Sequence, residues 1–131
     1  MATMDDLARF AEELPEVTMR PAWGNRMWRV HDRGFVWERP LTRTDREALG
    51  DDVPDGEIAA ARVEHELAKQ AMIASSPDRF FTVPHFDGFA AVLIRLDAID
   101  TDELREIVID AWLDRAPKRL SEAYLVENPP G

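Results

Sequence analysis

Apolar residues recur along the chain at two spacings, and each spacing predicts a different kind of element. Near the N-terminus they follow the three- and four-residue steps of an amphipathic helix, at Leu7, Phe10, Ala11 and Leu14. Thr3 is a suitable N-cap, and Pro15 prevents the helix from continuing. We therefore expect a helix over residues 4–14.

From Val17 to Arg39 the apolar spacing changes to two, because Trp28 and Val30 alternate with less apolar neighbours. The run Asp32-Arg33-Gly34 supplies turn chemistry, so this segment predicts two or three antiparallel strands. Pro40 ends the run and begins a connection.

The connection holds at most a short helical turn from Thr44 to Leu49, which Gly50 closes. After it, the segment from Glu57 to Ser75 is rich in alanine, glutamate, lysine and glutamine. Propensity alone favours one continuous helix over that segment.

Two β-rich arms follow Pro77 and flank the segment His85 to Gly88. The Asp87-Gly88 pair is the dipeptide that two-residue hairpin turns prefer. We therefore expect an antiparallel hairpin in this part of the chain, with Val92 and Ile94 buried.

Residues 101–114 carry the most complete helix signal. Asp100 is in position to cap this helix, and Glu103 follows three residues later, as in a capping box. Ile99 and Leu104 occupy the positions of a hydrophobic staple. The face that we expect to be buried consists of Leu104, Ile107, Val108, Ala111 and Trp112. Because strands and helices are segregated, the pattern predicts an α+β domain with an antiparallel sheet covered on one face.

Composition narrows the classes of function. A chain of 131 residues, 45% of them hydrophobic, suits one domain over residues 1–131, and we expect a monomer with a flexible tail over 127–131. The absence of cysteine excludes disulfides, thiolate zinc sites and nucleophilic thiols. With no apolar run of membrane-spanning length and no signal-peptide pattern, we expect a cytoplasmic protein that does not enter membranes.

No arrangement of residues predicts catalysis. The six glycines occur singly, so there is no phosphate-binding loop, and no Ser/His/Asp order suggests a nucleophile. His31, His65 and His85 lack the spacing of metal ligands. A histidine-carboxylate pair of His85 with Asp87 is an alternative, but the ordinary interpretation is a histidine bonded locally at a loop edge. An enzyme is therefore the less favoured hypothesis, and we expect no cofactor and no bound metal.

The charge of the chain is unevenly distributed. The formal net charge is -10, yet the segment from Arg20 to Arg46 has seven arginines and three acidic residues, a net charge of +4. In RPAWGNRMWRV, arginines alternate with Trp23 and Trp28 around a Gly-Asn turn, which is the mixture that a stacking nucleic-acid surface needs. The same pattern fits a sheet core with a solvated edge.

Three cations surround Pro117 in the run DAWLDRAPKRL. Pro117 ends the preceding helix, and Arg115 near its C-terminus interacts favourably with the helix dipole. Lys118 and Arg119 lie past that helix. They are either solvated or face a phosphate, a carboxylate ligand or an acidic partner.

Residues 80–120, FFTVPHFDGFAAVLIRLDAIDTDELREIVIDAWLDRAPKRL, closely resemble the MmcQ/YjbR family, and a weaker match extends back through AWGNRMWRVHDRGFVWERP to the first helix. The resemblance implies a frataxin-like α+β fold, in which an antiparallel sheet packs against terminal helices. It also implies a strand over 57–63 and a helix over 64–75, which we adopt in place of the continuous helix. A double-wing arrangement in this family has been proposed to bind DNA.

The frataxin-like fold raises one further alternative, an iron site on the first helix. Its acidic residues are Asp5, Asp6, Glu12, Glu13 and Glu16. An acidic run is ordinarily a solvated face, and a hard cation needs convergent oxygen ligands, so we expect no iron there.

Two hypotheses of function follow. The first is a DNA-binding protein with a double-wing-like basic surface; the alternative is a non-enzymatic module that holds a small anionic ligand or an acidic protein. The candidate residues for both are Arg20, Trp23, Arg26, Trp28, Arg29, Arg115, Lys118 and Arg119. A basic patch would join the last three to Arg20 or Arg26. Alternatively, adjacent acids such as Asp32, Asp114 and Glu122 neutralise these cations.

Overall fold

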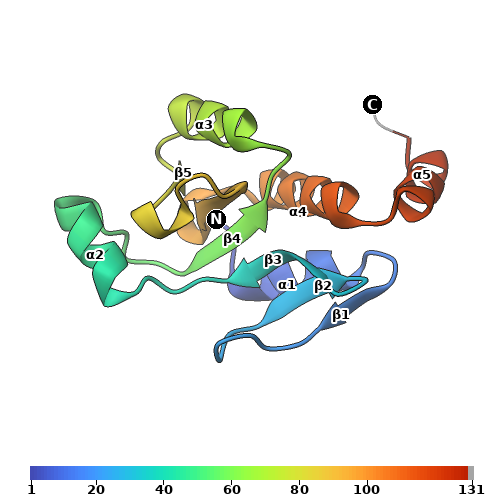
Figure 1. The fold of residues 1–131 in the computed structure, drawn as a ribbon, viewed down its shortest axis with the longest axis horizontal. Helices are drawn as coiled ribbons and strands as arrows, with labels where there is room; N and C mark the ends of the chain where they lie inside the picture. The colour runs from blue at the N-terminus through green and yellow to red at the C-terminus, as the bar shows by residue number, and fades with distance from the viewer. Residues whose placement is uncertain (130–131) are drawn as a thin grey trace.

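Six strands form one antiparallel sheet in the computed structural model, which describes residues 1–129, and their order across the sheet is β1-β2-β3-β4-β6-β5 (Figure 1). The strands are β1 (Val17–Met19), β2 (Met27–Val30), β3 (Arg33–Glu38), β4 (Ile58–Arg62), β5 (Phe80–Phe81) and β6 (Ala91–Arg95). The α-helices are α1 (Met4–Glu12), α2 (Arg43–Leu49), α3 (Glu66–Ser75), α4 (Thr101–Arg115) and α5 (Lys118–Glu127). The α+β class is therefore confirmed.

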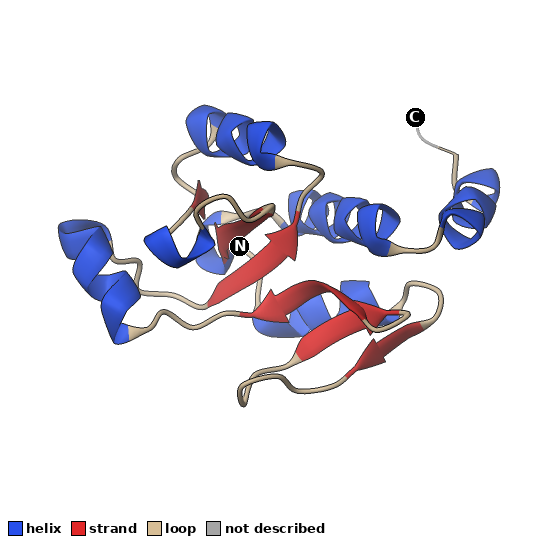
Figure 2. Ribbon diagram, in the orientation of Figure 1, coloured by secondary structure: helices blue, strands red, loops and turns tan. Residues whose placement is uncertain are grey.

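Helices α1 and α4 cover one face of the sheet and enclose the main core. Leu7 of α1, Val36 of β3 and Trp112 of α4 are fully buried in that core. The opposite face is less covered. A smaller apolar cluster forms there around Phe86 and Leu93, and Figure 2 shows no helix in front of strands β1, β2 and β3.

Capping boxes begin both N-terminal helices; the first starts at the expected residue and the second one residue earlier than expected. In α1, Thr3 accepts from the Asp6 N–H while the Asp6 carboxylate accepts from the Thr3 N–H. Thr42 and Asp45 exchange the same two bonds at the start of α2. Gly50 ends α2, as expected, with a positive φ of 59° that favours glycine.

A two-residue turn connects β2 and β3, and a bulge follows it. His31 and Asp32 form the turn with positive φ angles of 48° and 65°. Gly34 lies inside β3 instead of in the turn, opposite Arg29. The register then shifts by one residue, so that Phe35 and its neighbour Val36 are both fully buried.

The alanine-rich segment is a strand, as the family resemblance implied, and the continuous helix favoured by propensity is wrong. β4 lies between β3 and β6, where every residue from Ile58 to Ala61 is buried. Small side chains allow the helix layer to pack closely on this central strand, and these tertiary contacts outweigh the helix propensity of alanine. Helix α3 begins only after His65, whose Nδ1 accepts from the Ala68 N–H.

The expected pairing after Pro77 is confirmed, but the tight hairpin is wrong. Phe80 and Phe81 of β5 pair antiparallel with β6, while residues 82–90 form a longer loop with a 3-10 turn at Pro84–Phe86. Asp87 and Gly88 are the central residues of a type II turn, in which the Phe89 N–H donates to the Phe86 carbonyl at 3.0 Å.

Helix α4 has the expected bounds, but its expected capping box is absent. Asp100 is the N-cap but makes no side-chain capping bond, and the Glu103 carboxylate accepts from Arg79 Nε at 2.6 Å instead of from the Asp100 N–H. Ile107 is half-buried, while the other four residues of the predicted face are buried.

The sequence analysis missed α5, which begins immediately after Pro117. Tyr124 of this helix packs on Trp112, with ring centroids 5.1 Å apart. The tail expected over 127–131 begins with the last residue of α5, and residues 130–131 lie outside the part of the chain that the structure describes.

Candidate functional site

An aromatic groove of about 740 Å³ lies on the less covered face of the sheet. We use the name aromatic groove for the surface formed by Trp23, Met27, Trp37, Leu41, Phe86 and Phe89. These side chains come from the loop between β1 and β2, from β2 and β3, and from two further loops. Segments distant in sequence therefore converge on one apolar surface.

Three aromatic rings form one wall of the aromatic groove. Trp37 lies 6.4 Å from both Phe86 and Phe89, measured between ring centroids. Phe86 and Phe89 meet edge to face at 5.6 Å, which is a favoured geometry for aromatic pairs. The wall is consequently held in place by contacts among its own members.

Trp23 stands at the tip of the loop between β1 and β2 and is 99% exposed. Ala22 and Asn25 exchange two backbone hydrogen bonds of 2.8 and 3.0 Å around the central residues Trp23 and Gly24, whose φ angles are 55° and 80°. Asn-Gly is the preferred pair at these two positions, and a bulky residue with left-handed backbone costs about 1–2 kcal/mol. Trp23 therefore destabilises the turn, and its exposed side chain contributes no hydrophobic stabilisation in return.

Met27 supplies the floor of the groove because β3 has a glycine beneath it. A Cβ atom at Gly34 would lie only 2.7 Å from Met27 Sδ. The bare backbone at Gly34 therefore allows the flexible thioether to lie flat against the sheet.

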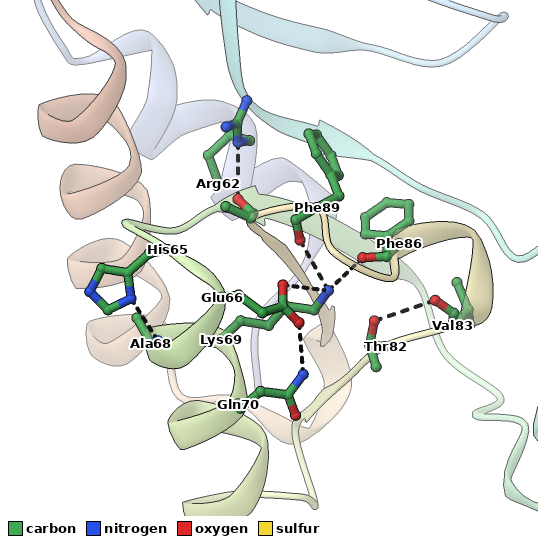
Figure 3. A network of polar contacts seen from close by, with 11 residues as sticks. Arg62, His65, Glu66, Ala68, Lys69, Gln70, Thr82, Val83, Phe86 and Phe89 are labelled. Atoms are coloured by element: carbon green, nitrogen blue, oxygen red, sulfur yellow. Dashed lines mark hydrogen bonds and ion pairs between the residues drawn. The ribbon is translucent and has the colours of Figure 1, made fainter.

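A fully buried lysine holds the loop that carries Phe86 and Phe89 (Figure 3). Lys69 Nζ, from α3, donates to the Phe86 carbonyl at 2.6 Å and to the Phe89 carbonyl at 3.0 Å. Glu66 Oε2 lies 3.6 Å from the same ammonium group. Lys69 thereby fixes the aromatic wall from behind.

The charged groups at the rim of the groove are already paired. Arg26 donates through Nε to Glu38 at 2.8 Å, and the guanidinium carbon of Arg39 lies 5.3 Å from the Phe86 ring centroid. Arg39 also contacts the buried Asp45 at 2.9 Å. Burial raises the pKa of Asp45, but the hydrogen bonds from Thr42 and the Arg39 guanidinium outweigh it, so the pKa lies below its ordinary value.

The two predicted tryptophans have opposite surroundings. Trp23 is exposed in the groove, but Trp28 is fully buried and donates through its indole N–H to Glu12 Oε2 at 2.8 Å. The expectation that Trp28 stacks on a nucleic acid is therefore wrong, because its ring faces the helix layer.

Carboxylates lie beside several of the predicted cations. Arg20 lies 3.8 Å from Asp32, and Lys118 lies 3.8 Å from Glu122, both in exposed pairs. The Nε atoms of Arg29 and Arg115 are buried without a hydrogen-bond partner in the described structure. Two of the three acids that we expected to neutralise these cations, Asp32 and Glu122, thus lie beside them.

Figure 1 shows α5 at a distance from the tip of the loop between β1 and β2, and no contact recorded within residues 1–129 joins Lys118 or Arg119 to Arg20 or Arg26. The shared basic patch stays a prediction.

The remaining polar candidates make local contacts. The exposed His31 lies 2.7 Å from Glu16, and His85 is exposed at the rim of the groove. Asp6 and Glu12, two acids of the first helix, are used for capping and for binding Trp28. Within residues 1–129 the structure contains no group of three or more histidines and acids placed to hold a metal ion.

The aromatic wall and its lysine were missed from the sequence. Phe86 and Phe89 flank Asp87-Gly88, and the hairpin interpretation gave them no role. Lys69 has no signal of its own, because its burial depends on carbonyl groups 17 and 20 residues away. The only part of the aromatic groove that the sequence indicated directly was Trp23, through its position beside the Gly-Asn turn.

No helix in the described part of the chain has the length and apolar character needed to cross a membrane.

Comparisons with known proteins identify a family, two relatives and a solved structure that this chain resembles. The model of the family YjbR matches residues 12–113. Uncharacterized protein Rv2570 of Mycobacterium tuberculosis and uncharacterized protein Mb2600 of Mycobacterium bovis are each 46% identical over 131 residues, covering 98% of this chain and 99% of the relative. A crystal structure of the Deinococcus radiodurans protein DR2400, with a DUF419 domain, is similar with a TM-score of 0.68 and 19% identity, covering 97% of this chain and 88% of that chain.

Proposed function

The chain belongs to the YjbR family, and from that premise we propose that it is a non-enzymatic binding protein whose aromatic groove holds a small organic ligand with a flat apolar ring. The observation that carries the proposal is Trp23. It is fully exposed, its backbone is in a conformation that favours Asn or Gly, and it borders a groove lined by three further aromatic rings.

Strain and exposure together support a role in binding. A tryptophan at this turn costs conformational energy and leaves a large apolar surface in water, so folding alone gives no reason for it. An incoming ring would cover that surface and recover part of its hydrophobic energy. Trp is also among the residues that most often carry binding energy at interfaces, because its ring offers a large contact area.

The size and lining of the groove favour a small molecule. Its volume of about 740 Å³ lies within the range of roughly 300–1,000 Å³ that is usual for ligand pockets. Such pockets are mainly apolar with a few polar groups that orient the ligand, and here Asn25, Thr42 and His85 stand at the rim.

The charges around the groove favour a neutral aromatic ligand over an anionic one. Arg39 is the arginine that lines the groove, and it contacts the Asp45 carboxylate at 2.9 Å. An anionic ligand would have to compete with that carboxylate. A neutral aromatic compound is therefore the expected ligand class.

DNA binding, the double-wing mode and the frataxin-like classification stay predictions of the family resemblance. The pairing of Arg20 and Arg26 and the burial of Trp28 give DNA binding no support. A DNA contact would release counterions, so the affinity for a duplex would fall steeply with salt, with a log-log slope of about -0.9 per neutralised phosphate.

The proposal is tested by titrating the protein with N-phenyl-1-naphthylamine, a neutral aromatic dye that fluoresces in apolar surroundings. We expect saturable binding at one site in the native protein and at least tenfold weaker binding in Trp23→Ala. The matched control is Leu67→Ala, because Leu67 is also an exposed large apolar residue, at 79%, but lies on α3 outside the groove. Equal affinity in the native protein and Trp23→Ala, or an equal loss in Leu67→Ala, would overturn the proposal.

A further inference from the structure

A second cleft, separate from the aromatic groove, lies between α3 and α4 at the end of β4. It encloses about 530 Å³. Half-buried side chains from both helices form its apolar floor, namely Ala68, Met72, Ile107 and Leu113. Charged residues of both signs, Arg62, Asp110 and Asp114 among them, complete its lining. We call this surface the interhelical cleft.

Arg62 is held firmly at one side of the interhelical cleft. Its Nε donates to the Ala90 carbonyl at 3.0 Å, and its guanidinium carbon lies 4.8 Å from the centroid of the Phe89 ring. Figure 3 shows its terminal nitrogens pointing away from that carbonyl. No carboxylate within residues 1–129 lies at ion-pair distance from Arg62. A fixed guanidinium with free terminal N–H groups is suited to bind a carboxylate in a bidentate manner.

Electrostatics around Arg62 also favour an additional anion. Burial and the nearby Arg115 lower the pKa of Arg62, and only Asp114 opposes them. Arg115 Nε is itself buried without a hydrogen-bond partner in the described structure. Two guanidinium groups therefore repel one another here, and a bound carboxylate would relieve that repulsion.

The α4 side of the cleft is acidic and therefore favours a cation. Asp110 and Asp114 are one helical turn apart, about 6 Å along the axis, and neither is in an ion pair within the described residues. Burial and the adjacent Glu106 raise the pKa of Asp110. A cationic group placed between these carboxylates would stabilise their charged forms.

From this arrangement we infer that the interhelical cleft binds a zwitterion with an apolar body, an amino acid or very short peptide with apolar side chains. The ligand carboxylate contacts Arg62, its ammonium group lies between Asp110 and Asp114, and its side chain covers Met72 and Ile107. This inference does not depend on the function proposed for the aromatic groove. Phe89 separates the two surfaces, since it borders the groove and carries Arg62 on its ring.

Calorimetric titration with L-leucine and L-leucyl-L-leucine tests the inference on the intact protein. We expect at least one of the two to bind with a Kd below about 1 mM. N-acetyl-L-leucine lacks the ammonium group and L-leucinamide lacks the carboxylate, so each should bind at least tenfold more weakly than leucine. These blocked compounds test both charges without altering the fold.

The variant Asp110→Asn, Asp114→Asn should weaken leucine binding at least tenfold and leave the affinity for N-phenyl-1-naphthylamine unchanged. Asp102→Asn is the matched control, because Asp102 is an exposed acid on α4 outside the cleft. Failure of both leucine and leucyl-leucine to bind at 1 mM would overturn the inference, and so would equal binding of the blocked compounds or an equal effect of Asp102→Asn. Because the dye reports on the other surface, loss of dye binding alone bears only on the aromatic groove.

Discussion

Replacement of Lys69 by methionine isolates the contribution of the buried ammonium group. Methionine preserves most of the apolar stem of lysine, so the change removes two hydrogen bonds with little loss of packing. The carbonyls of Phe86 and Phe89 lose the donor that they accept from at 2.6 and 3.0 Å. Each carbonyl keeps one backbone donor, the Phe89 N–H for Phe86 and the Ala91 N–H for Phe89, so the variant loses two charge-assisted hydrogen bonds. Such bonds are worth about 1.5–3 kcal/mol each, or about 3–6 kcal/mol for the pair.

Relaxation of the loop towards water reduces that cost, so we expect Lys69→Met to lower the free energy of unfolding by about 2–4 kcal/mol. Equilibrium urea unfolding measures the change, with the slope of the transition as a check that the unfolded state is comparable. The matched control is Glu66→Gln. Glu66 Oε2 is buried 3.6 Å from the ammonium group, but the side chain as a whole is 42% exposed and glutamine keeps an oxygen at this position. We therefore expect Glu66→Gln to cost about 1 kcal/mol, less than the loss of Lys69.

The same variant should weaken N-phenyl-1-naphthylamine binding, because the loop with Phe86 and Phe89 is no longer fastened to α3. A cost of Lys69→Met below about 1 kcal/mol would show that the two bonds from the ammonium group contribute little to stability, and the reasoning would fail. It would fail equally if Glu66→Gln were as destabilising as Lys69→Met.

Three further predictions concern stability. Trp112→Ala should lower the free energy of unfolding in urea by about 3–5 kcal/mol, because the ring is fully buried and its indole N–H donates to the Pro15 carbonyl; a loss under about 1 kcal/mol would contradict the packing. Trp23→Asn should raise thermal stability by about 1 kcal/mol through the preferred Asn-Gly turn while removing dye binding, and unchanged stability would show that the turn is not strained. The stabilising effect of Asp45 should be fully present above its ordinary pKa of 3.8 and be lost as the pH falls through its lower folded pKa. Urea unfolding of the native protein and Asp45→Asn from pH 7 to 2.5 should therefore converge only at the acid end, and a constant difference would refute it.

Local sequence signals predicted the elements whose stabilising contacts are close in sequence. Helix α1 has its cap three residues from its partner acid, and the turn at His31-Asp32 was placed within one or two residues by its neighbouring sequence. Helix α4 was placed correctly because its apolar stripe faces the core, although its cap was not, since Glu103 binds Arg79 from a distant loop.

The segments that local signals placed incorrectly depend on partners far along the chain. Alanines 59–61 form a strand because β3 and β6 supply hydrogen bonds on both sides, which only the family resemblance indicated. The Asp87-Gly88 turn sits within a longer loop, and Lys69 fastens the carbonyl on each side of it. The same long-range contacts create the aromatic groove, so the site could not follow from periodicity. The exposure of Trp23 and the burial of Trp28 likewise depend on which face of the sheet the helices cover.

The indole N–H signals of the four tryptophans test the central claim most directly, in one heteronuclear NMR titration with N-phenyl-1-naphthylamine. Trp23 and Trp37 line the aromatic groove, whereas Trp28 and Trp112 are buried on the helix-covered side and donate to Glu12 and Pro15. We predict that the signals of Trp23 and Trp37 shift in a saturable manner while those of Trp28 and Trp112 remain in place. Absence of any shift, or shifts of all four signals together, would contradict a ligand site in the aromatic groove.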